Sequence, residues 1–211
     1  MLSPGCCTIF LHSPAYFGGR RAAILMKPGA TFDVAARLAA GTLSLGEAFT
    51  FMSGLYFRGK MAYASAFGRN PDGPSSWVIT PTRGLQPPDR LIDRSTIDEF
   101  ARVDISRGGA TFTEPLLRDA RRLADSLRED ARLVLLGSIA TSKYLEVLLD
   151  VLGERLCFPP AFIGRGDMSR GGLMLRSAAS GEELDYVPAA TAATRRGPRP
   201  PKLPRLSRAP A

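Results

Sequence analysis

The sequence predicts an α/β fold: a single three-layer domain with a mostly parallel sheet flanked by helices, a C-terminal β-hairpin and a disordered tail. Residues 132–136 (RLVLL) form a nearly unbroken apolar run, typical of a strand buried on both faces. A helical pattern begins soon afterwards, near Lys143. Short apolar segments alternate with amphipathic helical patterns along most of the chain, and this alternation is typical of a parallel sheet. The length of 211 residues fits one domain of ordinary size.

The composition is that of a globular protein, with 45% hydrophobic and 23% charged residues. The net charge of +8 is unevenly spread. Residues 188–211 carry six Lys and Arg side chains and no acidic one, which leaves +2 for residues 1–187. We therefore predict a nearly neutral domain over 1–187 and a disordered, basic Pro/Arg-rich tail over 188–211. Any contact with nucleic acid is expected through this tail.

Several classes of protein are disfavoured by simple counts. No apolar stretch approaches the roughly 20 residues that cross a bilayer, and the first apolar run, 6–11, is too short for a signal peptide. We expect a cytoplasmic protein with no membrane contact. Cysteines at 6, 7 and 157 form no disulfide framework and are expected to be buried thiols. His12 is the one histidine, which argues against a His-based zinc site or a His-dependent triad; no metal or cofactor is predicted.

The order of elements follows from apolar periodicity and capping signals. Ser44 and Glu47 have the spacing of a capping box, which predicts a helix start. The leucines and Tyr186 between Leu173 and Val187 alternate around a polar turn, which predicts a β-hairpin. The expected strands span 6–11, 76–80, 132–136 and 156–163, and the expected helices lie near 33–39, 44–56, 95–101, 113–127 and 143–152.

The turn after strand 132–136 carries the strongest site signal. Gly137 ends the strand, and Ser138, Thr141 and Lys143 then surround the start of a helix. The first backbone N–H groups of a helix lack partners and the helix dipole favours negative charge there, so this turn is suited to phosphate. The segment lacks the second glycine and the Lys-Ser/Thr pair of a Walker A loop, which disfavours nucleoside triphosphate hydrolysis by that machinery.

Polar loops follow the other three predicted strands. In an open α/β sheet, ligands bind beyond the carboxyl ends of the strands. Asp167 and Asp89 are the candidate general acid or base, and glycines 164, 166, 171 and 172 would let the last loop close as a lid. The remaining candidate ligand-binding residues of these loops are Ser13, Arg20, Arg83, Arg165, Ser169 and Arg170.

Other patterns have plainer interpretations that stay open. The loop between His12 and Arg20 can equally be a simple strand-to-helix connection. Arg58 and Lys60 are interpreted as basic residues that extend along an amphipathic helix toward solvent, slightly ahead of a ligand role. The Arg165-Gly-Asp167 triplet resembles an adhesion motif, but no secretion signal accompanies it.

The chain resembles a family of uncharacterised bacterial proteins. The motifs that carry the resemblance are SPAYFGGR, GLYFRGKMAYA, ITPTRGLQPPD, LLGSIATSKY and GRGDMSRGG, which run from Ser13 to Gly172. More distantly, the order of strands, loops and helices is similar to α/β domains of the uracil-DNA-glycosylase-like class. This second resemblance implies an α/β fold and a ligand that contains a base or nucleoside.

The leading hypothesis is that the protein binds a phosphorylated nucleotide- or nucleoside-like ligand at the strand ends, with chemistry on its base or sugar. Ser138, Thr141 and Lys143 would hold the phosphate, and Arg83 and Arg165 would add charge-assisted hydrogen bonds. The alternative is a non-catalytic binding or interaction module whose basic tail contacts nucleic acid or a partner protein.

Overall fold

The computed structural model describes residues 7–140, 142–191 and 197–203. The described residues form a six-stranded sheet in the order β3-β2-β1-β4-β5-β6. The four central strands are parallel, and the two short edge strands are antiparallel to their neighbours. The strands are β1 (Thr8–His12), β2 (Ser76–Ile79), β3 (Leu85–Gln86), β4 (Arg132–Leu136), β5 (Leu156–Phe158) and β6 (Val187–Pro188). The predicted fold class, a three-layer α/β domain with a mostly parallel sheet, is confirmed.

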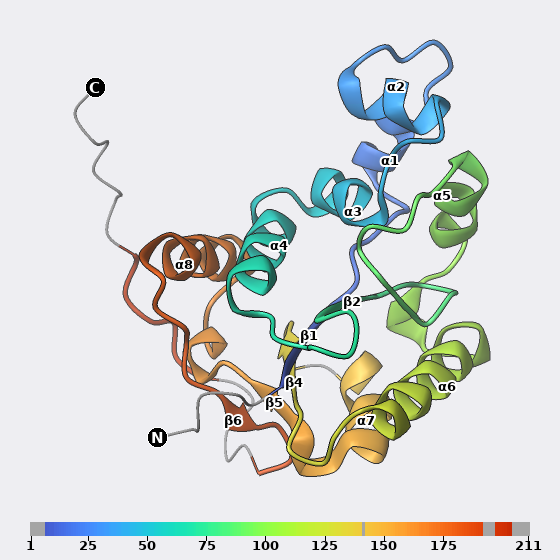
Figure 1. Ribbon diagram of the computed structural model, residues 1–211. Coiled ribbons are helices and arrows are strands. Elements are labelled where there is room, and N and C mark those ends of the chain that lie inside the picture. The colour runs from blue at the N-terminus through green and yellow to red at the C-terminus, as the bar shows by residue number, and fades with distance from the viewer. Residues whose placement is uncertain (1–6, 141, 192–196, 204–211) are drawn as a thin grey trace.

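Helices cover both faces of the sheet (Figure 1). The capping box at Ser44 and Glu47 forms with both of its hydrogen bonds and starts α3, as predicted. The helices are α1 (Arg20–Leu25), α2 (Asp33–Ala39), α3 (Leu45–Ser53), α4 (Leu55–Phe67), α5 (Arg94–Ala101), α6 (Ala110–Ser126), α7 (Ser142–Leu152) and α8 (Asp167–Ser180), with 3-10 turns at Ile105–Arg107, Gly153–Arg155 and Pro160–Phe162.

The two faces of the sheet have separate apolar cores. Leu133 and Leu135 pack with α6 and α7. Val134 and Leu136 point to the opposite face and pack with α4 and α8. Figure 1 accordingly places α6 and α7 on one side of the strands, and α4 and α8 on the other. Alternating side chains of one strand thus serve two cores, which explains the unbroken apolar run in its sequence.

The chain reverses its direction of travel across the sheet between β1 and β4. From β1 the chain passes through α1–α4 to β2 on one side, and later returns through α5 and α6 to β4 on the other side of β1. The two strands are parallel, with His12 opposite Leu136, so their carboxyl ends lie at one edge. Such a topological switch point opens a crevice between the diverging connections.

The predicted C-terminal hairpin is wrong, because residues 167–180 form the helix α8. Met174 is buried in the core while Leu173 packs at its border, so the apparent alternation belongs to a helix face. The helix ends at Gly181, whose φ of 73° is the left-handed conformation usual after a helix. The flexible glycine lid over 164–172 is therefore also wrong, since Gly171 and Gly172 lie inside α8.

Gly171 of α8 and Gly59 of α4 allow the close crossing of these two helices. A Cβ on Gly171 would come within 2.7 Å of the Leu55 carbonyl oxygen, and one on Gly59 within 2.6 Å of the Gly171 carbonyl oxygen. Both distances are shorter than real Cβ contacts, so the two helix backbones touch directly at these residues. This contact sets the position of α4, which carries Tyr56 and Lys60.

The domain extends slightly beyond the predicted boundary at Val187. Ala189 is fully buried, and its N–H donates to the Leu156 carbonyl oxygen at 2.7 Å. Further on, residues 197–203 lie beside α8, where Arg165 Nη1 donates to the Pro201 carbonyl oxygen at 3.4 Å. Residues 192–196 and 204–211 of the predicted tail lie outside the described residues.

Candidate functional site

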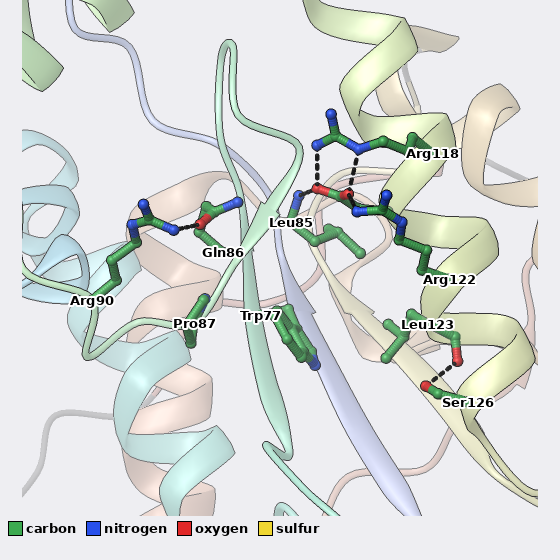
Figure 2. Close-up of a pocket in the computed structure, with 10 residues that line it drawn as sticks. Trp77, Leu85, Gln86, Pro87, Arg90, Arg118, Arg122, Leu123 and Ser126 are labelled. Atoms are coloured by element: carbon green, nitrogen blue, oxygen red, sulfur yellow. Dashed lines mark hydrogen bonds and ion pairs between the residues drawn. The ribbon is translucent and has the colours of Figure 1, made fainter.

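One cavity, of about 430 Å³, lies between the β2–β3 hairpin and α6 (Figure 2). Its most prominent charges already have partners: Asp119 Oδ2 accepts from the Leu85 N–H at 3.1 Å, and the guanidinium of Arg118 binds the same carboxylate. Arg122 approaches this carboxylate at 3.9 Å. These contacts attach the edge strand β3 to α6, so we interpret them as stabilising the fold.

A larger cavity, of about 770 Å³, lies at the carboxyl ends of β1 and β4. It is thus located at the topological switch point, where α/β sheets bind ligands. Loops after both strands, the starts of α1, α7 and α8, and residues of α3 and α4 all contribute to its walls.

Five of the residues predicted for the site line this cavity: Ser13, Arg20, Ser138, Lys143 and Asp167. Ser13 directly follows β1, and Ser138 follows β4 after one intervening residue, Gly137. Lys143 and Asp167 lie in the first turns of α7 and α8. The predicted meeting of Lys143 and Asp167 at one cavity therefore occurs, although their roles stay predictions. Thr141 lies outside the described residues.

Two predicted residues after β2 do not line the cavity. Arg83 forms a two-pronged ion pair with Glu99 of α5, with Nε 3.0 Å from Oε1 and Nη2 2.5 Å from Oε2. Asp89 is exposed in the loop beyond β3. Arg83 is held away from the cavity because its guanidinium pairs with Glu99 of α5. The sequence of the loop around Arg83 does not reveal this partner.

Three predicted residues around α8, Arg165, Ser169 and Arg170, also do not line the cavity. Arg165 Nη1 donates to Ser169 Oγ at 3.2 Å, and both residues line the surface hollow beneath residues 199–203. Arg170 is largely buried; its Nε donates to the Phe162 carbonyl oxygen at 3.2 Å, and its Nη1 lies 3.5 Å from Oδ1 of the cavity residue Asp167. Because Ser169 and Arg170 are consecutive residues of a helix, their side chains project to different sides.

The structure adds a residue that the sequence argument placed in solvent. The Lys60 side chain is 1% exposed, so the interpretation as a solvent-directed lysine is wrong. Its Nζ donates to the Ser13 carbonyl oxygen at 2.9 Å and lies 2.7 Å from Ser13 Oγ. It also lies 4.1 Å from the centre of the Tyr56 ring. Burial lowers the pKa of Lys60 to about 7, with the charge of Arg170 acting in the same direction and that of Asp167 opposing it.

His12 is buried beside this lysine. Its Nε2 hydrogen-bonds Ser76 Oγ at 2.5 Å, and its ring lies 5.6 Å from that of Phe57. Burial, together with the nearby charge of Lys60, lowers the pKa of His12 to about 3. At neutral pH His12 is therefore uncharged, so it adds no second positive charge behind the cavity.

Tyr144 connects the ends of β1 and β4. Its hydroxyl accepts from the Ser138 N–H at 3.1 Å and donates to the Ser138 carbonyl oxygen at 2.9 Å. A Cβ on Gly137 would come within 3.0 Å of this hydroxyl and within 3.1 Å of Ser13 Oγ, so Gly137 leaves room for both. Burial raises the pKa of Tyr144, which keeps this phenol protonated.

Comparisons with protein-family models, curated proteins and solved structures return no match to this chain.

The chemistry offered by the cavity wall is cationic and hydroxyl-rich. Arg20, Arg21 and Lys143 provide positive charge, and Asp104 and Asp167 provide two carboxylates. Arg21 Nη1 also donates to the Phe51 and Met52 carbonyl oxygens, each at 3.1 Å. Within the described ranges, no helix is long and apolar enough to cross a membrane. The same residues contain no cluster of three or more His, Cys, Asp or Glu side chains arranged to hold a metal ion.

Proposed function

We propose that the protein binds a phosphorylated, nucleotide-like ligand in the cavity at the carboxyl ends of β1 and β4. The observation that carries the proposal is the convergence of Arg20, Arg21 and Lys143 on one cavity at the topological switch point. Charge-assisted hydrogen bonds from such cations are the usual means of holding phosphate. Ser138, between β4 and α7, adds a hydroxyl on the same wall.

An exposed aromatic ring supports the nucleotide part of the proposal. Tyr16 lines the cavity and keeps 65% of its surface exposed, so its ring is accessible to a ligand. Bases stack on such rings with little dependence on their identity. The volume of about 770 Å³ falls in the range of small-molecule sites and accommodates a mononucleotide.

We expect Lys143→Met to weaken binding of a nucleoside monophosphate about tenfold or more, because a hydrogen bond to a charged group contributes roughly 1.5–3 kcal/mol. Tyr16→Ala should weaken binding of the nucleotide but leave binding of inorganic phosphate nearly unchanged, since it removes only the stacking surface. Isothermal titration calorimetry of the full chain with both ligands measures these effects.

Lys27→Met is the matched control, because Lys27 is an exposed lysine that does not line the cavity. Its binding should equal that of the wild type. If the wild type binds none of a panel of nucleotides, nucleosides and sugar phosphates, the proposed ligand class is refuted. Equal losses from Lys27→Met and Lys143→Met would refute the proposed location.

A further inference from the structure

Ser13 and Lys60 form a hydrogen-bonded pair that the proposed binding of a nucleotide does not require. The ammonium of Lys60 is enclosed by Ser13, the aromatic rings of Tyr56 and Phe57, and the end of β1. Among the described residues, no carboxylate lies within ion-pair distance of its Nζ. A buried amine with two hydrogen-bond partners and no carboxylate in direct contact is costly to the fold, and an apolar side chain would fill the same space at lower cost.

Ser13 joins this buried amine to the cavity. Ser13 lines the cavity, and 5% of the residue is exposed. Ser13 Oγ lies 2.7 Å from Lys60 Nζ, within reach of direct proton transfer. Ser13 Oγ also hydrogen-bonds the Tyr144 hydroxyl, next to the space that Gly137 leaves open. The serine hydroxyl thus contacts both the buried amine and a phenol, in a residue that lines the cavity.

We propose that Ser13 and Lys60 are a catalytic dyad that cleaves a carboxylic ester, with Ser13 as nucleophile and Lys60 as general base. This inference goes beyond the proposed binding function and uses the same cavity. We prefer an ester carbonyl to a phosphate group as the electrophile, because the negative charge of a phosphate group repels an attacking oxygen. The cations of the cavity would bind a phosphate group of the ligand instead.

The reaction is balanced with water as the second substrate. Lys60 Nζ takes the proton from Ser13 Oγ while that oxygen bonds the carbonyl carbon; the carbon–oxygen bond to the alcohol breaks, and Lys60 returns the proton to the departing alcohol. Water then attacks the acyl-serine, Lys60 takes a proton from the water, and the serine leaves with that proton. The products are the alcohol and the carboxylic acid, and the dyad is regenerated.

The surroundings of Lys60 are consistent with a base that works near neutral pH. The groups that face it are His12 of β1, Tyr56 of its own helix, and Asp167 and Arg170 of α8. His12 is neutral, and burial raises the pKa of Tyr56 to well above its ordinary value, so neither changes charge near pH 7. The rate of acylation should therefore rise with pH through a single inflection near pH 7, where Lys60 loses its proton.

The test is covalent labelling of the full chain with a fluorophosphonate and with p-nitrophenyl acetate, followed by mass spectrometry of peptides to locate the modification. We expect both reagents to modify Ser13, with a rate that inflects near pH 7. Lys60→Met should slow the modification about 100-fold or more, as expected for loss of a general base. Ser13→Ala should abolish it.

Matched variants separate the dyad from general reactivity and from misfolding. Ser65→Ala changes an exposed serine of α4, and Lys27→Met changes an exposed lysine; both should be labelled at Ser13 as fast as the wild type. Addition of a small primary amine should restore part of the labelling rate in Lys60→Ala, which a purely structural role of Lys60 would not allow.

Labelling only at residues other than Ser13, or equal rates in Lys60→Met and the wild type, would overturn the dyad. Transfer of phosphate from p-nitrophenyl phosphate to Ser13, with none of acetate, would overturn the ester as substrate class. Because neither labelling reagent carries a phosphate group, failure of the dyad leaves the nucleotide-binding test unaffected, and failure of nucleotide binding leaves the labelling test unaffected.

Discussion

Lys60→Met should make the protein more stable at pH 6, by about 1–3 kcal/mol in the free energy of unfolding. The pKa of Lys60 is lowered from 10.5 to about 7 in the folded protein because the ammonium loses its hydration on burial. Each pKa unit corresponds to about 1.4 kcal/mol, so the charged form costs several kcal/mol at pH 6. Loss of the two hydrogen bonds to Ser13 offsets part of the gain.

The effect has a defined pH dependence. Between about pH 7 and pH 10.5 the unfolded chain holds a proton on Lys60 that the folded chain has released, so the wild type gains stability as pH rises through this window. The Lys60→Met variant lacks this gain, and its advantage should shrink from pH 7 upward. Burial also raises the pKa of Tyr63 to about 12, so this phenol keeps its proton on folding and lowers stability above pH 10. Measurements should therefore end near pH 9.5.

Urea denaturation of the wild type, Lys60→Met and Lys27→Met at pH 6, 8 and 9.5 measures the effect. Lys27 is exposed, so its substitution should leave the wild-type pH dependence unchanged. A Lys60→Met variant less stable than the wild type at pH 6 would show that Lys60 supports the fold. Such a result would contradict the inference that this amine is retained for chemistry at Ser13.

Gly171→Ala should destabilise the protein by about 1–3 kcal/mol, although alanine favours helices. The new Cβ would meet the backbone of α4, 2.7 Å from the Leu55 carbonyl oxygen and 2.9 Å from Tyr56 Cα, and backbone atoms cannot move aside as a flexible side chain can. Overpacking of this kind costs more than helix propensity returns. The displaced helix α4 also carries Lys60, so the dyad distance should lengthen.

Gly172→Ala is the matched control in the same helix. A Cβ there meets only Leu203 Cδ1 at 3.6 Å, an ordinary contact, so alanine should be neutral or stabilise by up to about 1 kcal/mol. Thermal and urea unfolding of both variants measure the difference. Equal stability of the two variants would contradict the direct backbone contact between α4 and α8.

The sequence predicts the central strands well because their signal is local. The apolar run at 132–136 and the Ser44–Glu47 capping box depend on neighbouring residues, and both predictions are confirmed. The parallel arrangement follows from helices between strands, and it correctly brings Lys143 and Asp167 to one cavity. In these elements the local sequence preference agrees with the overall fold, so the local pattern alone predicts them.

The failures concern residues whose role depends on distant partners. Gly171 resembles a loop glycine until α4 lies against it, and Arg83 resembles a ligand-binding residue until Glu99, 16 positions away, pairs with it. Lys60 was missed because its partner Ser13 is 47 positions away and no local pattern marks a buried lysine. A useful signal was nevertheless present: Lys60 follows a glycine in a helix segment, 55–67, that is mostly apolar and aromatic.

The most direct test of the central claim is a crystal structure of the full chain with a nucleoside 5′-monophosphate at saturating concentration. We expect the phosphate within about 3 Å of Lys143 Nζ, a hydrogen-bond distance, and the base against the Tyr16 ring in the cavity at the ends of β1 and β4. A nucleotide bound instead beside Arg118 and Arg122, or between α8 and residues 199–203, would contradict it.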